Sequence, residues 1–341
     1  MPGAWSLAQG EESVVSKPEA ADPDVFGLFS LVEPEMRLVA RQIEAVVRDE
    51  NRLVAEVADA LVAAPGKRLR PALVLLAGQA AGASSAVLLP TATAVELIHM
   101  ATLTHDDILD RADWRRGEPA VRAVANDQVA VLAGDFLFAR AVQLLASTGR
   151  PAVVAEAAEV VHAMCLGEIR QHLGHGRRPS ESEYLGRIEA KTATFLAICC
   201  RLGALASDAG PEVSEPLYQF GWQVGMAFQL VDDLLDLLAD PDKLGKAVAA
   251  DYGQGVLTLP VVYALAESRD AQELEDLLER GHPADLPRVR LILHESGALD
   301  YVRAKIEGYR VGAAHALATL KPSPAVRALD VLATFVVTRD F

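Results

Sequence analysis

Aromatic residues are scarce in this chain. They make up 5% of its 341 residues, although hydrophobic residues as a whole make up 51%. The core must therefore consist mainly of Ala, Leu and Val, and because Ala and Leu favour helices, the composition predicts an all-α protein. Alternating runs of Val, Ile or Thr bounded by hairpin turns are also missing, so we expect almost no strands.

Cysteines are few as well, and Cys165, Cys199 and Cys200 have no metal-ligand spacing. Adjacent cysteines rarely bridge, so a reducing compartment is expected. The N-terminus lacks a basic segment followed by an apolar run, which predicts no signal peptide. Apolar stretches such as residues 193–200 are interrupted by charge, here Arg201, which predicts no transmembrane segment. Together these absences predict a soluble, cytoplasmic protein.

Positive charge is in the minority, because the formal net charge is −15. An acidic chain of this kind is a poor partner for nucleic acid, and we expect none. Basic residues nevertheless gather at positions 67–70, Lys-Arg-Leu-Arg, and at Arg115 and Arg116. Local positive charge in an acidic chain indicates one particular anionic ligand.

The chain is predicted to consist of a flexible tail and one helical domain. Residues 1–22 mix Gly, Ser, Glu, Pro and Ala without periodicity, whereas residues 23–341 contain no linker that would divide them. One long helix is expected from Pro90 to about Arg111, and another from near Glu215 to Asp240, ended by Pro241.

Each of these two helices carries the same pattern of carboxylates, Asp-Asp-x-x-Asp, at residues 106–110 and 232–236. On a helix the first and last carboxylates of the pattern lie one turn apart on one face. Two such faces brought together in an apolar protein need cations to neutralise them. Ligands that are all oxygen suit Mg²⁺, which leaves coordination sites for substrate phosphates. The two motifs therefore predict a site with several Mg²⁺ ions for a diphosphate.

Other polar residues are weaker candidates when each is taken alone. His99 precedes Asp106 by two helical turns on the same face, although a lone His in an apolar helix is often a core residue. Lys191 lies in a helix of Ala, Leu and Phe, where a lysine is usually an edge residue. Gln229 lies about one turn before Asp232. The basic clusters could equally be solvated surface or helix caps.

Taken together and in order, these motifs resemble the trans-isoprenyl diphosphate synthases of the polyprenyl synthetase family. The resemblance covers about residues 25–341 and rests on GKRLRP (66–71), HDDILD (105–110), RRGEP (115–119), KTA (191–193) and FQLVDDLLD (228–236). It implies a single-domain bundle of mostly antiparallel helices around a deep central cavity, usually as a homodimer. It also implies a reaction in which an allylic diphosphate ionises and its carbocation alkylates isopentenyl diphosphate.

The resemblance assigns a role to each matching position. The direct Mg²⁺ ligands would be Asp106, Asp110 and Asp232. Asp107, Asp233 and Asp236 would be further ligands or would support the ligands from behind, with three ions when diphosphate is bound. The allylic diphosphate would be held by Arg115, Lys191 and Lys246. Isopentenyl diphosphate would be held by Lys67, Arg70, His99 and Arg116. Thr192 and Gln229 would stabilise the carbocation by their dipoles, and Gln229 would also bind substrate. The expected catalytic residues are Asp106, Asp110, Asp232, Lys191, Thr192 and Gln229.

Two positions depart from the family pattern. Val256 follows Gly255 where the family usually has a lysine, so one cation for the allylic diphosphate is missing. Ala247 stands where the family usually has a proline after the Gly-Lys pair. Weaker binding of the allylic substrate is therefore expected.

Product length is predicted from the helix that carries the first acidic motif. Below Asp106 this helix presents Thr102, Ala101 and Ile98 toward the expected tail cavity. Short-chain members of the family have bulky aromatics at the first two positions, and small residues there favour a product of C20, geranylgeranyl diphosphate, or longer. Phe136 and Phe138 in the next helix are candidates for a deeper floor, or else ordinary core aromatics.

Three alternatives stay open at the level of sequence. A class I terpene cyclase also ionises prenyl diphosphates, but the second acidic motif, residues 66–71 and the scarcity of aromatics count against it. A non-catalytic subunit of a heteromeric synthase is favoured by Val256 alone. Finally, the acidic faces of a helical protein could bind divalent ions without any catalysis.

Overall fold

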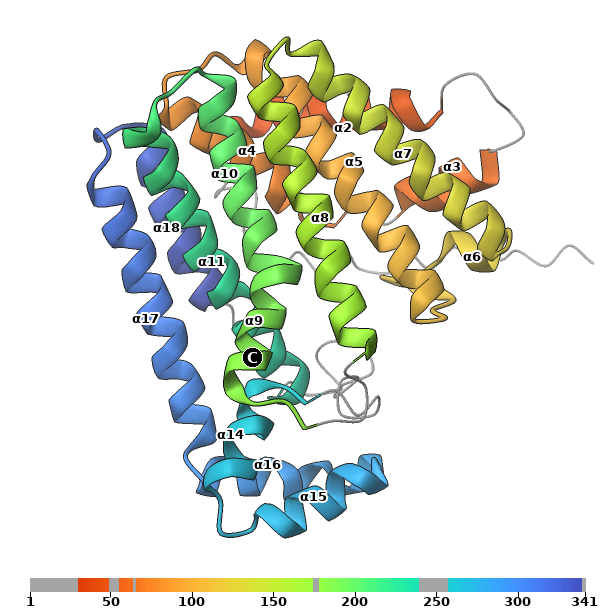
Figure 1. The fold of residues 1–341 in the computed structure, drawn as a ribbon, viewed down its shortest axis with the longest axis vertical. Helices are drawn as coiled ribbons and strands as arrows, with labels where there is room; N and C mark the ends of the chain where they lie inside the picture. The colour runs from red at the N-terminus through yellow and green to blue at the C-terminus, as the bar shows by residue number, and fades with distance from the viewer. Residues whose placement is uncertain (1–29, 49–54, 64–65, 174–177, 239–256, 339–341) are drawn as a thin grey trace, which may run out of the picture.

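The structure, a computed structural model, describes residues 30–48, 55–63, 66–173, 178–238 and 257–338. The predicted tail at residues 1–22 therefore lies outside the described residues. Within the described ranges the chain is a bundle of helices with one short hairpin (Figure 1). The predicted all-α class and the near absence of strands are confirmed.

The elements follow one another along the chain in a simple order. The first half contains η1 (Ser30–Val32), α2 (Glu33–Val47), α3 (Ala55–Ala63), α4 (Leu69–Ala80), α5 (Ser85–Leu109), β1 (Trp114–Arg115), β2 (Glu118–Pro119), α6 (Val121–Val124), α7 (Asp127–Ser147) and α8 (Pro151–Leu173). The second half contains α9 (Glu181–Ile188), the π-helical turn η3 (Glu189–Ala193), α10 (Thr194–Ala206), α11 (Pro211–Leu238), α14 (Leu259–Glu267), α15 (Ala271–Arg280), η4 (Pro283–Asp285), α16 (Leu286–Glu295), α17 (Ala298–Ala318) and α18 (Pro324–Thr338).

The two acidic helices are longer at their beginnings than the sequence predicted. α5 begins at Ser85, so Pro90 lies inside it, and α11 begins at Pro211, before Glu215. Pro90 was a wrong start point because a proline near the first turn of a long helix loses only one backbone hydrogen bond. Both motifs lie at the C-terminal ends of their helices, which run toward the same end of the bundle (Figure 1).

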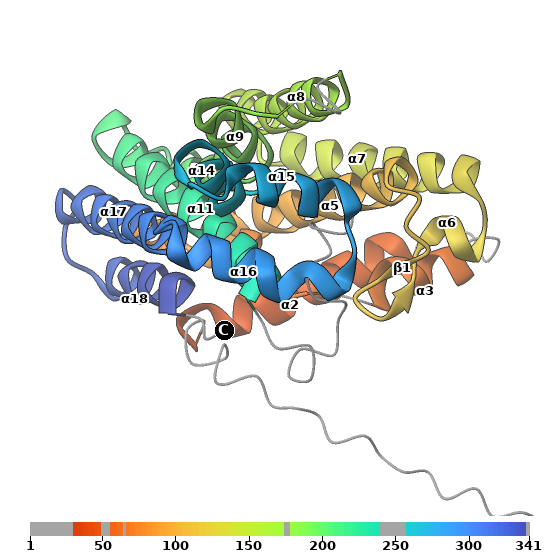
Figure 2. The same cartoon turned by 90° about the horizontal axis from the view of Figure 1, so that it is seen from below.

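The core is built from small and branched aliphatic side chains, as the composition predicted. α10 packs against α4, α8 and α11, and α5 packs against α4 and α7. Close packing depends on glycine where helices touch by their backbones: a Cβ at Gly225 of α11 would lie 2.5 Å from the Cα of Ala193 in η3. α15 and α16 lie across the end of the bundle where α11 ends (Figure 2).

Two helices, α5 and α7, are long and apolar enough to cross a membrane by length and composition. Charged residues in them are therefore too sparse to exclude such a span, contrary to the sequence argument. In the best window of α5, 56% of the residues are buried inside the bundle, as expected of a core helix, against 33% for α7. The difference leaves α7 with an exposed apolar face.

Candidate active site

The first basic cluster and the basic hairpin meet at Gly66. Gly66 has a φ of +60°, and a Cβ there would lie 2.0 Å from Nη1 of Arg116. A glycine leaves room for this guanidinium group and adopts the left-handed backbone without strain. The turn at residues 66–68 and the hairpin β1–β2 are therefore packed together, and they bring Lys67 and Arg116, distant in sequence, to one place.

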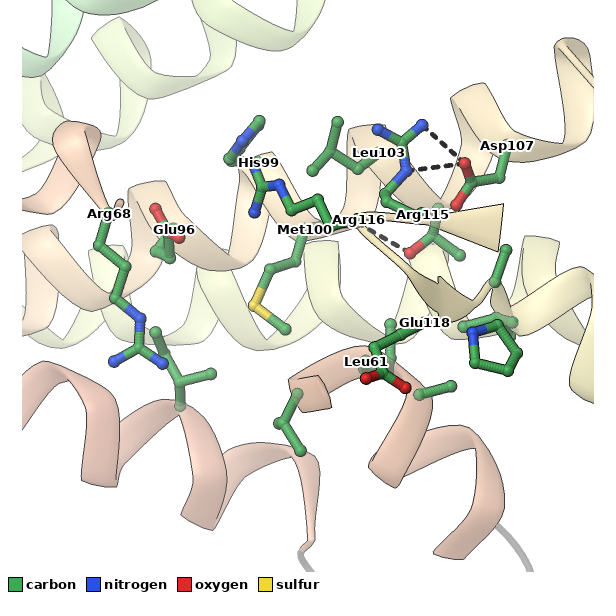
Figure 3. A pocket seen from close by; sticks show the side chains of 17 residues that line it. Leu61, Arg68, Glu96, His99, Met100, Leu103, Asp107, Arg115, Arg116 and Glu118 are labelled. Atoms are coloured by element: carbon green, nitrogen blue, oxygen red, sulfur yellow. Dashed lines mark hydrogen bonds and ion pairs between the residues drawn. The ribbon is translucent and has the colours of Figure 1, made fainter. Parts of the chain in front are cut away.

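A pocket of about 60 Å³ opens between this turn, α2, α3, α5 and the hairpin (Figure 3). Its charged lining consists of Arg68, Glu96, Asp107, Arg115, Arg116 and Glu118, with His99 among them. Apolar residues such as Ile43 and Met100 complete the wall. The pocket thus combines guanidinium groups with apolar surface, which is what an organic diphosphate requires.

His99 lines this pocket from α5 and is nearly enclosed. Its ring packs edge-on against Phe195, with the ring centroids 6.3 Å apart, and its Nδ1 has no hydrogen-bond partner among the described residues. Burial lowers the pKa of His99 well below its usual value, and the neighbouring charge of Arg70 lowers it further. Arg70 itself stacks over Phe195, with Cζ 4.7 Å from the ring centroid. The imidazole is therefore neutral at pH 7 in the ligand-free protein.

The first acidic motif divides into an inner and an outer part. Asp107 is buried, and its Oδ1 accepts hydrogen bonds from Nε and Nη2 of Arg115 at 2.7 and 2.6 Å. Asp106 is half-buried, whereas Asp110 is exposed and ends α5 as its C-cap residue. The middle carboxylate of the motif, Asp107, is therefore turned toward the hairpin.

Asp106 is the point where the site's elements converge. Burial raises the pKa of its carboxyl, and the other charges that act on it belong to Lys191, Glu168, Asp110 and Arg115. These residues come from η3, α8, the end of α5 and the hairpin. Two of these residues, Glu168 and Lys191, are distant from Asp106 in the sequence, and the fold brings them within electrostatic range of its carboxylate.

Lys191 and Thr192 lie in the π-helical turn η3, a local widening of a helix that is often found at functional sites. The Nζ of Lys191 lies 3.2 Å from Oε2 of Glu168. The turn packs against α11 at Ala193 and Gly225. The extra residue in the turn changes the direction of the Lys191 and Thr192 side chains relative to the helices on either side.

The second acidic motif contains a chain of hydrogen bonds. The hydroxyl of Tyr184 donates to Oδ2 of Asp233, Nε2 of Gln229 donates to Oδ1 of Asp233 at 2.9 Å, and Oγ1 of Thr192 donates to Oε1 of Gln229 at 2.9 Å. Burial raises the pKa of Asp233 to about 6, although the bonds from Tyr184 and Gln229 oppose this. Asp233 is thus committed to protein partners, while Asp232 and Asp236 are half-buried.

Within the described ranges, no group of three or more His, Cys, Asp or Glu residues lies close enough to hold a metal ion by itself. The donors that are present are nevertheless carboxylate oxygens, the ligands that Mg²⁺ prefers. Asp107 and Asp233 are held by protein donors, which fits a supporting role for these two carboxylates. Lys246 and Val256 lie outside the described residues.

The three residues expected to set product length lie on the inner side of α5. Ile98 and Ala101 are buried, and Thr102 is half-buried, with its Oγ1 donating to the carbonyl oxygen of His99 at 2.8 Å. Phe136 is 41% exposed, so it is not a floor formed within its own chain. The ring of Phe138 packs near His105, with centroids 5.9 Å apart.

Three residues of this region were not singled out from the sequence. Tyr184 stands seven positions before Lys191, and Glu96 stands one helical turn before His99 in an apolar helix. Glu96 could have been singled out from the sequence, because it is a charged residue in an apolar helix. Arg68 was read only as part of a basic cluster, and its left-handed backbone, with φ of 48°, which directs it into the pocket, leaves no trace in the sequence.

Comparison with known protein families shows to which family this structure belongs. A model of the family described as polyprenyl synthetase matches residues 51–294. This chain belongs to the polyprenyl synthetase family. It is accordingly a prenyltransferase of the polyprenyl and geranylgeranyl diphosphate synthase type, as the order of its motifs predicted.

Matches to individual relatives cover most of the chain of this family member. It is 36% identical over 316 residues to heptaprenyl diphosphate synthase component 2 of Geobacillus stearothermophilus, which covers 92% of this chain and 98% of the relative. It is 35% identical over 289 residues to geranylgeranyl diphosphate synthase of Methanosarcina mazei, with 82% and 88% covered.

A solved structure supports the same family assignment for this polyprenyl synthetase family member. The polyprenyl synthase of Caulobacter crescentus CB15, crystallised with calcium and isoprenyl diphosphate, matches with a TM-score of 0.84 and 36% identity. The match covers 92% of this chain and 97% of that chain. The isoprenoid synthase fold predicted from the sequence is therefore confirmed.

Proposed function

We propose that this protein condenses isopentenyl diphosphate with an allylic diphosphate to give an all-trans product of C20 or longer. The observation that carries the proposal is the convergence on Asp106 of Lys191, Glu168 and Arg115. An acidic metal motif beside a lysine and an arginine is the arrangement that an ionising diphosphate needs.

In this proposal Asp106, Asp110 and Asp232 hold Mg²⁺, supported by Asp107, Asp233 and Asp236. Bound Mg²⁺, with three ions per site, supplies the positive charge that stabilises the departing diphosphate. Arg115, Lys191 and Lys246 hold the same allylic diphosphate from the protein side. Support for dividing the aspartates in this way comes from Arg115, which fixes Asp107, and from Tyr184 and Gln229, which fix Asp233.

Isopentenyl diphosphate is proposed to bind in the pocket beside α2 and α3. Lys67, Arg70 and Arg116 bring positive charge to its diphosphate, and neutral His99 can donate one hydrogen bond. Thr192 and Gln229 face the reacting carbons as oriented dipoles. Neither is a strong nucleophile, so they stabilise the cation without being alkylated.

The direct test is incubation of the purified protein with isopentenyl diphosphate, Mg²⁺ and, separately, C5, C10, C15 and C20 allylic diphosphates. A discrete all-trans product of C20 or more establishes the synthase and its product length. If no starter is elongated by correctly folded protein, the assignment moves to a subunit or a cyclase.

Replacement of Ala101 by Phe is expected to shorten the product by about one isoprene unit. A helical turn rises about 5.4 Å, close to the length of an extended isoprene unit, and the new ring would fill that turn. Product sizing by chromatography checks this result, with Ala304→Phe on the exposed side of α17 as the control. An unaltered product would mean that α5 does not form the floor.

Replacement of Val256 by Lys is expected to lower KM for the allylic substrate by roughly tenfold, because it restores one cation for the diphosphate. KM for isopentenyl diphosphate should stay the same, since a different set of residues is proposed for it. Steady-state kinetics with each substrate varied in turn provide the measurement. An unchanged allylic KM removes this role for position 256.

The proposed assembly is a cytoplasmic homodimer that buries the outer face of α7. That face exposes Leu132 (67%), Phe136 (41%) and Val142 (53%), an apolar stripe that a second copy can cover. The name of the Geobacillus relative, a component 2, supports a second possibility, in which a different subunit covers the same face. Light scattering on the isolated protein separates the two, because only a homodimer forms without a partner.

A further inference from the structure

Glu96 is a carboxylate enclosed in a pocket that otherwise fits an anion. It lies on α5, its residue is 4% exposed, and it lines the pocket between Arg68 and the pair His99 and Arg116 (Figure 3). Its Oε2 accepts no hydrogen bond from any described residue. A buried carboxylate with an unsatisfied oxygen costs free energy, so its presence requires an explanation.

Three arginines lie within electrostatic range of Glu96. Arg70 acts on it most strongly, followed by Arg68 and Arg116, and all three oppose the effect of burial, which raises the pKa of its carboxyl. Arg70 and Arg68 belong to the start of α4, and Arg116 belongs to the hairpin. Cys199 of α10 also lies within electrostatic range of the Arg70–Glu96 pair.

The unsatisfied groups of this cluster are complementary to a ligand. Nε of Arg70 and Nδ1 of His99 also have no hydrogen-bond partner among the described residues. Two potential donors and one acceptor are thus buried together without satisfying one another. A diphosphate in the pocket would accept a hydrogen bond from Nδ1 of His99, which lines it, but it would add negative charge beside Glu96.

We propose that Glu96 is the internal counter-charge of this arginine cluster: it balances the guanidinium groups in the empty site and competes with the diphosphate for them. This proposal rests on the proposed function, because it takes the anion to be isopentenyl diphosphate. Glu96 is then a positioning residue, which acts on the substrate through Arg68, Arg70 and Arg116. It holds the cluster together before binding and weakens the binding itself.

Without Glu96 the empty cluster would lose a negative charge that acts on Arg70, Arg68 and Arg116. Burial already lowers the pKa of Arg70 and of Arg116, and the charge of Glu96 is among the effects that raise both. Removing that charge therefore destabilises the ligand-free protein. The same removal abolishes like-charge repulsion toward a diphosphate, so the two effects have opposite signs.

The experiment is Glu96→Gln in the full chain, which keeps the shape and removes the charge. We expect the variant to bind isopentenyl diphosphate and inorganic diphosphate about tenfold more tightly in calorimetry without an allylic substrate. Its ligand-free melting temperature should fall below that of the wild type, and saturating diphosphate should close the gap. A merely structural role would weaken binding together with stability.

Glu35→Gln is a matched control. Glu35 also has an unpartnered Oε2, but it lies on α2 beside Ser85, away from the arginine cluster. This variant should change the affinity for diphosphate by less than about twofold while it affects stability. If Glu96→Gln does not fold, the double variant Arg68→Gln/Glu96→Gln tests the counter-charge instead. It removes one positive charge together with the negative charge, so the net charge of the cluster stays the same. Recovery of folding supports the counter-charge, and continued failure overturns it.

The outcomes also separate this proposal from the proposed function. A wild type that binds neither diphosphate contradicts the function itself. A wild type that binds both, with Glu96→Gln binding equally or more weakly, contradicts only the role of Glu96.

Discussion

Replacement of Asp106 by Asn is expected to lower kcat/KM by about 10³-fold. Asp106 is the carboxylate on which Lys191, Glu168 and Arg115 act, so loss of its charge removes a proposed metal ligand at the centre of the site. The half-saturating Mg²⁺ concentration should rise as well, by about tenfold or more. Steady-state rates measured over a titration of Mg²⁺ give both quantities.

Asp300→Asn is the control for this experiment. Asp300 is an exposed aspartate at the start of α17, paired with Arg303, and belongs to neither acidic motif. Its variant should keep wild-type rates and Mg²⁺ dependence. A folded Asp106→Asn protein with the wild-type Mg²⁺ dependence would show that Asp106 is not a ligand, whatever happens to its rate.

The positions of the aspartates could be predicted because a repeated pattern in apolar helices is a strong signal. Asp106 and Asp232 follow directly from the sequence, and so does the helical class of the whole chain. The sequence also predicted that both motifs lie late in their helices, although Pro90 led to a helix start five residues too late. Periodicity reports the face and the interior of a helix better than its first turn.

The spacing of each motif could not predict which of its aspartates hydrogen-bonds to protein side chains. Asp107 turns toward Arg115 because a two-residue hairpin returns the chain beside α5, and Asp233 turns toward Tyr184 because η3 connects α9 to α10. Tyr184 lies 49 positions from Asp233, and Arg115, although only 8 positions from Asp107, lies in a different element. A π-helical turn adds one residue, so counting in steps of 3.6 from Tyr184 to Lys191 gives the wrong face.

Replacement of Tyr184 by Phe is expected to lower kcat by about 10–100-fold, because a hydrogen bond to a charged group contributes roughly 1.5–3 kcal/mol. The hydroxyl of Tyr184 binds Asp233, which in turn fixes the amide of Gln229 and, through it, Thr192. Without the hydroxyl, Asp233 can rotate, and the dipole of Gln229 loses its orientation. KM for both substrates should change little, because neither diphosphate is held by this chain of bonds.

Tyr301→Phe is a matched control, since Tyr301 also donates its hydroxyl to a carboxylate, that of Glu181 at 2.7 Å, but outside this chain. It should leave kcat unchanged even where it lowers the melting temperature. A double-mutant cycle then isolates the mechanism: in a Gln229→Ala background, Tyr184→Phe should have almost no further effect on kcat. Additive effects would mean that Tyr184 stabilises the bundle without orienting Gln229. Thr192 and Gln229 are proposed to face the carbocation. A non-additive loss confined to kcat would therefore show that Tyr184 contributes to the chemical step. It would do so without touching the substrate, because it acts through Asp233 and Gln229.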